Sequence, residues 1–71
     1  MIRNPQTKQP KLTEKEKEVI SCMAQGLSTK QIAEKLFNST KTISNHRENM
    51  LEKFGLENSV QLVDKWRRGE V

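Results

Sequence analysis

The residues of this chain that could recognise a partner are concentrated in one stretch, "TKTISNHRENMLEKF", residues 40 to 54. Its apolar residues recur at helical spacing, which places Ile43, Met50 and Phe54 on one face of a predicted helix. The opposite face carries ammonium, amide and carboxylate groups on Lys41, Asn45, Glu48 and Glu52. Such groups occur on solvated helix surfaces, and they also occur on helices that contact the edges of base pairs. Both interpretations are open at this point.

Two predicted helix starts carry hydroxyl and ammonium groups that suit phosphate binding. These residues are Ser28, Thr29 and Lys30 at one start, and Thr40, Lys41 and Thr42 at the other. The first turn of a helix has free N–H groups and a partial positive charge, so such residues can hold a nucleic-acid backbone without contacting its bases. The alternative is ordinary helix capping with solvated lysines.

Four helices are expected to position these residues, at roughly 14–25, 29–36, 40–54 and 59–68. The capping signals at their starts are Thr13 with Glu16, Ser28 with Gln31, Ser39 or Thr40, and Asn58 with Gln61. Glycines are placed to end the first, third and fourth helices, at Gly26, Gly55 and Gly69. No strand pattern or internal repeat is present, so the predicted fold class is all-α, a four-helix helix-turn-helix domain.

Apolar residues at helical spacing predict which face of each helix is buried. For the first helix and the turn after it these residues are Val19, Ile20, Met23, Ala24 and Leu27, and for the second they are Ile32, Ala33, Leu36 and Phe37. The fourth helix carries Val60, Leu62, Val63 and Trp66. Cys22 and the methionines are interpreted as packing residues, because a single cysteine forms no intramolecular disulfide.

The 71 residues suffice for one small domain, which we expect to span residues 12–71. Residues 1–11 contain two prolines and no apolar periodicity, so they are predicted to be a flexible linker or an N-terminal arm. The chain is then either the C-terminal piece of a longer protein, which we favour, or a free-standing domain with a basic arm. The absence of a long apolar run and of a signal-peptide pattern predicts a cytoplasmic protein without membrane contact.

The net charge is +4, and it is distributed unevenly along the chain. Three basic residues lie in the stretch up to Lys11, which has no acid, whereas the 10 basic and 9 acidic residues that follow leave a net of only +1. Bulk basicity is therefore mostly a property of the N-terminal stretch, and nucleic-acid binding by the folded part must be argued from local features.

The run from Leu12 to Val63 resembles the LuxR-type (GerE-like) helix-turn-helix domain of bacterial transcription regulators. The resemblance rests on "LTEKEKEV", "GLSTKQIAEKLF", "TKTISNH" and "LEKFGL", which follow one another in the family's register without a gap. It implies sequence-specific binding of double-stranded DNA, usually behind an upstream receiver or ligand-sensing domain. It further implies a homodimer formed through the fourth helix, which here carries Val60, Val63 and Trp66, on half-sites about 10 base pairs apart.

On this interpretation, the base-contacting residues are Lys41, Ser44, Asn45 and Glu48. Asn pairs with adenine, Lys donates to guanine and Glu accepts from the cytosine amino group. Glu52 lies farther from the helix start and is expected to face solvent. Family members often have a basic residue where this chain has Ser44 and Glu48, so a target sequence cannot be borrowed from them.

Further backbone contacts are expected from Arg47, Asn49 and Lys53 in the third helix. Arg47 lies close to the apolar face, where its stem can cover apolar surface while the guanidinium reaches a phosphate or an acid of the first helix. Lys53 also suits the negative end of the helix dipole. His46 matches a position where the family usually has histidine and is expected to be a packed, hydrogen-bonded residue at the edge of the core.

An enzyme is not expected, because no nucleophile with a base, no metal-ligand spacing and no phosphate-binding glycine loop is present. We likewise expect no cofactor, no metal and no small-molecule ligand. The main alternative to DNA binding is a helical protein-interaction module that docks on the transcription machinery, with RNA polymerase as the obvious partner. Promoter recognition of the sigma-factor kind shares the helix-turn-helix but fits the order of the motifs less well.

Overall fold

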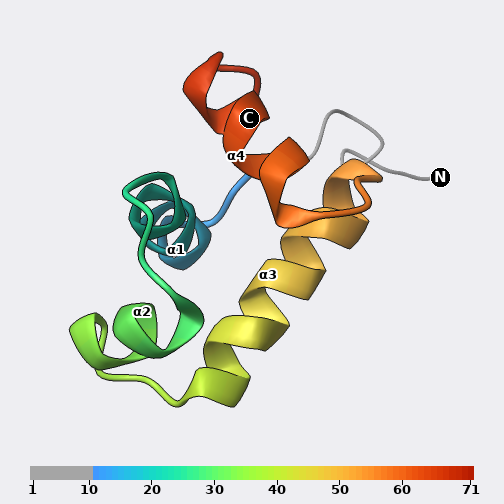
Figure 1. Ribbon diagram of the computed structural model, residues 1–71. Helices are drawn as coiled ribbons and strands as arrows, with labels where there is room; N and C mark the ends of the chain where they lie inside the picture. The colour runs from blue at the N-terminus through green and yellow to red at the C-terminus, as the bar shows by residue number, and fades with distance from the viewer. Residues whose placement is uncertain (1–10) are drawn as a thin grey trace, which may run out of the picture.

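The computed structural model describes residues 11–71, which form four helices around one core (Figure 1). The helices are α1 (Glu14–Ala24), α2 (Thr29–Lys35), α3 (Thr40–Phe54) and α4 (Ser59–Arg67). The described part of the chain contains no strand, which confirms the predicted all-α fold class. Most of the predicted linker, residues 1–10, lies outside the described residues.

Each helix begins where its capping signal predicts. Thr13 and Glu16 form the reciprocal capping box of α1, and Ser28 and Gln31 form that of α2. The Ser39 hydroxyl accepts from the Thr42 N–H at the start of α3, and the Asn58 side chain accepts from the Gln61 N–H at the start of α4. Because these bonds connect residues three positions apart, the helix starts were predictable from the sequence.

The turns that enter and leave α3 both contain a residue with positive φ. Gly55 follows α3 with a φ of 67°, as expected of a glycine C-cap. In the turn between α2 and α3, Phe37 has a φ of 58°. Among the residues that the structure describes, it is the one non-glycine residue with a positive φ.

Three helices end slightly earlier than the sequence predicted. α1, α2 and α4 each end one residue before the predicted position, at Ala24, Lys35 and Arg67.

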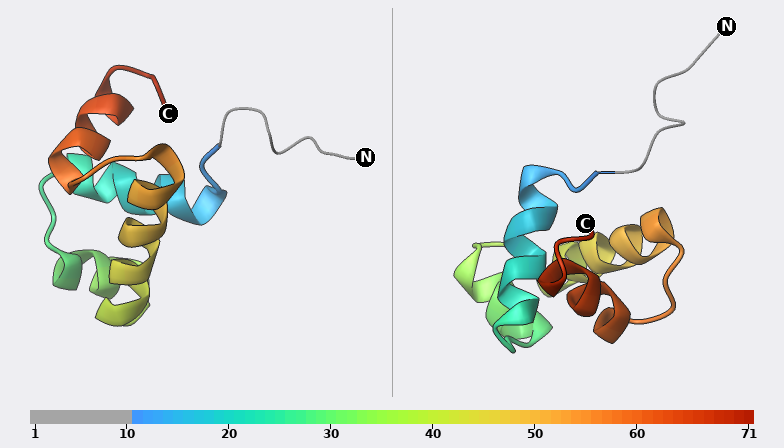
Figure 2. Two further views of the ribbon diagram at one scale, coloured as in Figure 1. Left: turned by 90° about the vertical axis from the view of Figure 1, so that its right-hand side faces the viewer. Right: turned by 90° about the horizontal axis from the view of Figure 1, so that it is seen from above.

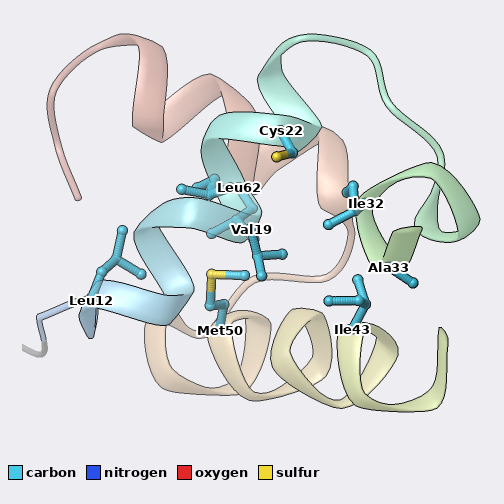
Figure 3. Packing of buried hydrophobic residues seen from close by; sticks show 9 residues of the cluster. Leu12, Val19, Cys22, Ile32, Ala33, Ile43, Met50 and Leu62 are labelled. Atoms are coloured by element: carbon cyan, nitrogen blue, oxygen red, sulfur yellow. The ribbon is translucent and has the colours of Figure 1, made fainter. Parts of the chain in front are cut away.

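α1 packs against each of the other helices, so the core forms around it. α2 lies beside the N-terminal part of α3 (Figure 2), and the first residue of α4, Ser59, lies beside the middle of α3, where it bonds to Arg47. Figure 3 shows the buried cluster, which extends from Leu12 to Ala33 with Val19 and Met50 between them. The fully buried side chains are Ile20, Ile32, Ile43, Met50, Leu62 and Val19. Cys22 is also buried, which confirms its interpretation as a packing residue.

Two residues predicted in the buried stripes are exposed instead. Phe37 is 94% exposed, because α2 has ended and the left-handed backbone takes this side chain away from the helix face that carries Ile32. Val60 is 78% exposed. It is two positions from the fully buried Leu62, a spacing that places the two side chains on opposite sides of α4.

No helix within residues 11–71 is long and apolar enough to cross a lipid bilayer.

Candidate nucleic-acid interface

The outward face of α3 presents three polar side chains to solvent. Lys41, Asn45 and Glu48 are exposed, and within residues 11–71 their side chains make no hydrogen bond or ion pair. Ser44 is half-buried beside them and lines a shallow hollow with Glu48. The four residues predicted to contact bases thus lie on one accessible part of α3, with donors and acceptors available to a partner.

The start of α3 combines an internal cap with an exposed first turn. The Ser39 hydroxyl lies 2.9 Å from that of Thr42, so the Thr42 side chain is engaged in the cap. Thr40 and Lys41 are exposed, and the first turn contains no acid. The backbone N–H groups of Thr40 and Lys41 have no partner within the helix, as at any helix start.

The start of α2 is more constrained. Ser28 exchanges both capping-box hydrogen bonds with Gln31, at 2.8 and 3.1 Å. Lys30 is exposed, whereas Thr29 is half-buried and its hydroxyl accepts a 2.7 Å hydrogen bond from Arg47. Of the three residues predicted to hold phosphate here, Lys30 has the freest side chain.

Arg47 links three helices. From α3, its Nη1 donates to Thr29 Oγ1 of α2, and its Nη2 donates to Ser59 Oγ of α4 at 2.8 Å. Its Nε is buried and has no partner within residues 11–71. The partners of the guanidinium are therefore two hydroxyls, instead of the acid of the first helix considered from the sequence. These contacts were not predictable from local sequence patterns, because Thr29 and Ser59 are 18 and 12 positions away.

Lys53 forms a second long-range contact. Its Nζ donates to Glu16 Oε1 at 2.7 Å and to the Lys11 carbonyl oxygen at 3.0 Å. Burial raises the pKa of the Glu16 carboxyl, but hydrogen bonds from Lys53 and Thr13, together with the Lys53 charge, outweigh it and hold the pKa below its ordinary value of 4.5. The Lys53 ammonium is thus paired inside the protein.

For the other residues of α3 singled out from the sequence, the described part of the chain offers no side-chain bond that would fix their orientation. Asn49 and Glu52 are exposed. His46 is half-buried as expected, but its ring makes no hydrogen bond within residues 11–71, unlike the prediction. Among the described residues, no three His, Cys, Asp or Glu side chains come together as ligands for a metal ion.

The residues predicted to mediate dimerisation differ in burial. Val60 is exposed, Val63 is half-buried, and Trp66 is partly buried against the core. Val60 and Val63 border an open groove of about 440 Å³ between α4 and the side formed by α1 and α2. Its lining includes Met23, Leu27, Ile32, Thr29, Arg47, Ser59, Asp64 and Arg67.

The sequence of this chain matches a known protein family. Residues 10–66 match the family described as bacterial regulatory proteins, luxR family, which confirms the resemblance noted from the motifs. The chain is 41% identical over 63 residues to the spore germination protein GerE of Bacillus subtilis. This alignment covers 87% of this chain and 85% of GerE.

Similar identity extends to longer regulators. The transcriptional regulatory protein UhpA of Salmonella typhimurium is 43% identical over 58 residues, and that of Escherichia coli is 44% identical over 56 residues. These alignments cover 82% and 79% of this chain, but the chain spans only 30% and 29% of the two UhpA proteins.

Proposed function

This chain belongs to the luxR family of bacterial regulatory proteins, and on that premise we propose that it binds specific DNA sequences by placing α3 in the major groove. The helix-turn-helix comprises α2 and α3, which pack together. Its role is that of the DNA-binding domain of a transcription regulator.

The observation that carries this proposal is the exposed, unbonded state of the outward side chains of α3. Lys41, Asn45 and Glu48 offer, within residues 11–71, an ammonium, an amide and a carboxylate that no neighbouring side chain engages. These are the groups that distinguish guanine, adenine and cytosine in the major groove. Ser44, beside them, can donate to or accept from any base.

The helix starts supply the sequence-independent contacts of the proposal. Lys30 and the exposed Thr40 approach phosphates from the starts of α2 and α3, with Ser28, Thr29 and Thr42 beside them. Asn49 is a further candidate for the DNA backbone. The internal hydrogen bonds of Arg47 and Lys53 favour roles inside the protein for these two residues.

Binding as a homodimer is the second part of the proposal. Val60 is exposed and Val63 half-buried on the same helix, so α4 has apolar surface that a second copy can cover. A two-fold axis through this contact requires two half-sites about one helical turn of DNA apart, roughly 10 base pairs.

A protein-interaction module that docks on RNA polymerase is the alternative function. It is favoured by the acids of α3, since Glu48 and Glu52 are both exposed and Lys41 is the single cation on that face. DNA binding weakens steeply as the salt concentration rises, because phosphate contacts release counterions. Binding that is indifferent to salt would therefore favour a protein partner.

Selection of bound duplexes from a random DNA library, at near-physiological salt and with the 71-residue chain, tests the proposal. We expect an enriched motif with two-fold symmetry. Lys41→Ala should weaken binding and reduce the salt dependence, as loss of a cationic contact requires, and it should relax the preference at the base that Lys41 contacts. Absence of enrichment, with a folded protein verified in the same sample, would contradict sequence-specific binding by this chain alone.

A further inference from the structure

Arg47 occupies the gap between the two helices that do not contact each other. Of the helix pairs within residues 11–71, α2 and α4 form the one that does not pack together. The open groove borders both helices, and Arg47 lines this groove as well as the hollow that Ser44 and Glu48 line. Its guanidinium joins Thr29, the first residue of α2, to Ser59, the first residue of α4.

We propose that Arg47 is a positioning residue for DNA binding, which ties the start of α2 to α4 through α3. The inference rests on the proposed function and identifies the side chain that holds α2 in position relative to α3 and α4. Ser59 belongs to α4 and is not among the proposed DNA contacts, yet it accepts one of the two hydrogen bonds that fix the guanidinium. The position of Thr29 relative to the outward face of α3 therefore depends on α4.

The hydrogen-bond chemistry supports a positioning role. A hydroxyl has one hydrogen to donate and two lone pairs that accept. Because Thr29 Oγ1 accepts from the Arg47 cation, its own hydrogen remains available for another acceptor, and the charged donor strengthens that second bond. Arg47 thus orients the Thr29 hydroxyl while its charge stays inside the domain.

The partners of the guanidinium separate this role from simple stabilisation. Both are neutral hydroxyls and Arg47 is half-buried, so its replacement by an apolar side chain of similar volume leaves no uncompensated charge inside the protein. We therefore expect Arg47→Met to reduce DNA affinity more than it reduces stability. A purely structural arginine would lower both together.

The decisive variant is Ser59→Ala, which frees one end of the guanidinium and leaves its charge in place. Its matched control is Ser21→Ala, a half-buried serine on α1 whose side chain makes no hydrogen bond within residues 11–71. Affinity for the selected duplex and its salt dependence are measured for both variants, with folding verified by circular dichroism. Amide hydrogen exchange of α2 is measured in the absence of DNA.

We expect Ser59→Ala to weaken binding about tenfold, as loss of a charge-assisted hydrogen bond predicts, with an unchanged salt slope. Exchange of the α2 amides should become several-fold faster, while Ser21→Ala behaves like the wild type. Wild-type affinity and wild-type α2 exchange in folded Ser59→Ala would overturn the proposal.

Direct phosphate contact by Arg47 gives a different result. Ser59→Ala would then bind as well as the wild type or better, and Arg47→Met would reduce the salt slope by about 0.9. A wild-type protein that binds no duplex would refute the proposed function. Faster α2 exchange in Ser59→Ala would in that case still establish the link between α4 and α2, and its role in DNA binding would be refuted.

Discussion

Along α3, the outward side chains of Lys41, Asn45 and Glu48 extend into solvent without a bond inside residues 11–71, whereas Lys53 near the other end is held by Glu16 and the Lys11 carbonyl. Both ends contribute apolar residues to the core, Ile43 near the start and Met50 farther along. The difference lies in the polar residues. The outward side chains of Lys41, Asn45 and Glu48 are free to bind a partner, whereas Lys53 is used to hold α1.

This difference shows that the charge of a residue does not reveal its role. Lys41 and Lys53 are both lysines of α3, and sequence analysis assigned both to DNA. In the structure Lys41 is exposed, whereas the Lys53 ammonium pairs with a Glu16 side chain that is only 7% exposed. Substitutions on the outward face and at the internal contacts of α3 should therefore separate effects on DNA binding from effects on stability.

The largest effect is expected in the core, to which α3 contributes Met50. Met50→Ala should lower the free energy of unfolding by about 2 to 5 kcal/mol, because it removes a fully buried side chain and leaves a cavity. Lys41→Ala should change it by no more than about 0.5 kcal/mol. Urea unfolding followed by circular dichroism measures both. Equal losses would contradict the division of α3 into a buried face and an outward face that is free for a partner.

The ion pair of Lys53 predicts a pH dependence. Because the folded-state pKa of Glu16 lies below 4.5, its carboxylate stabilises the fold at pH values above 4.5, and this contribution is lost as the pH falls through the folded pKa. Lys53→Met removes the hydrogen bond and the charge that lower the pKa of Glu16, whereas burial and the Thr13 hydrogen bonds remain, so this pKa should rise and acid unfolding should begin at a higher pH. At pH 7 the free energy of unfolding should fall by about 1 to 3 kcal/mol.

The control for this prediction is Lys41→Met, which removes a lysine that has no ion pair within residues 11–71. Acid titration of both variants, followed by circular dichroism, makes the comparison. If the two unfold at the same pH, the Glu16 to Lys53 contact does not stabilise the domain.

A specific effect on base preference is expected on the outward face of α3. Asn45→Ala and Glu48→Ala should each relax the preference at one base step, by about 1 to 3 kcal/mol, with little change in stability. Glu52→Ala is the matched control, since Glu52 is also exposed on α3 but lies farther from the helix start. Competition binding with single-base variants of the selected duplex measures the effect. A uniform loss across all duplexes would contradict direct base contact.

The smallest effect concerns the two turns that bound α3. Phe37→Gly should raise the free energy of unfolding by up to about 1 kcal/mol, because glycine adopts the φ of 58° without strain and little buried surface is lost. Gly55→Ala should lower it by a similar amount, because its φ is 67°. Thermal unfolding is sensitive enough for both. A destabilised Phe37→Gly would indicate that the exposed ring contributes to the fold.

Local patterns predicted the four helices because their signals act over a few residues. The capping box of Thr13 and Glu16 and the cap from Asn58 to Gln61 both connect residues three apart, and the buried Val19, Ile43 and Leu62 lie on the predicted stripes. The order of motifs was sufficient to identify the family. The predicted burial of Phe37 was wrong, because it required α2 to continue to a residue at which the backbone is left-handed.

The sequence alone thus determined the helices, their starts and the group of polar residues on the outward face of α3. The tertiary structure decided which cationic side chains remain free, since Arg47 bonds to Thr29 and Lys53 to Glu16 across 18 and 37 positions of the chain. The physical reason is one of range. Capping and periodicity operate within a turn or two, whereas the partner of a long basic side chain depends on how the helices pack around the core.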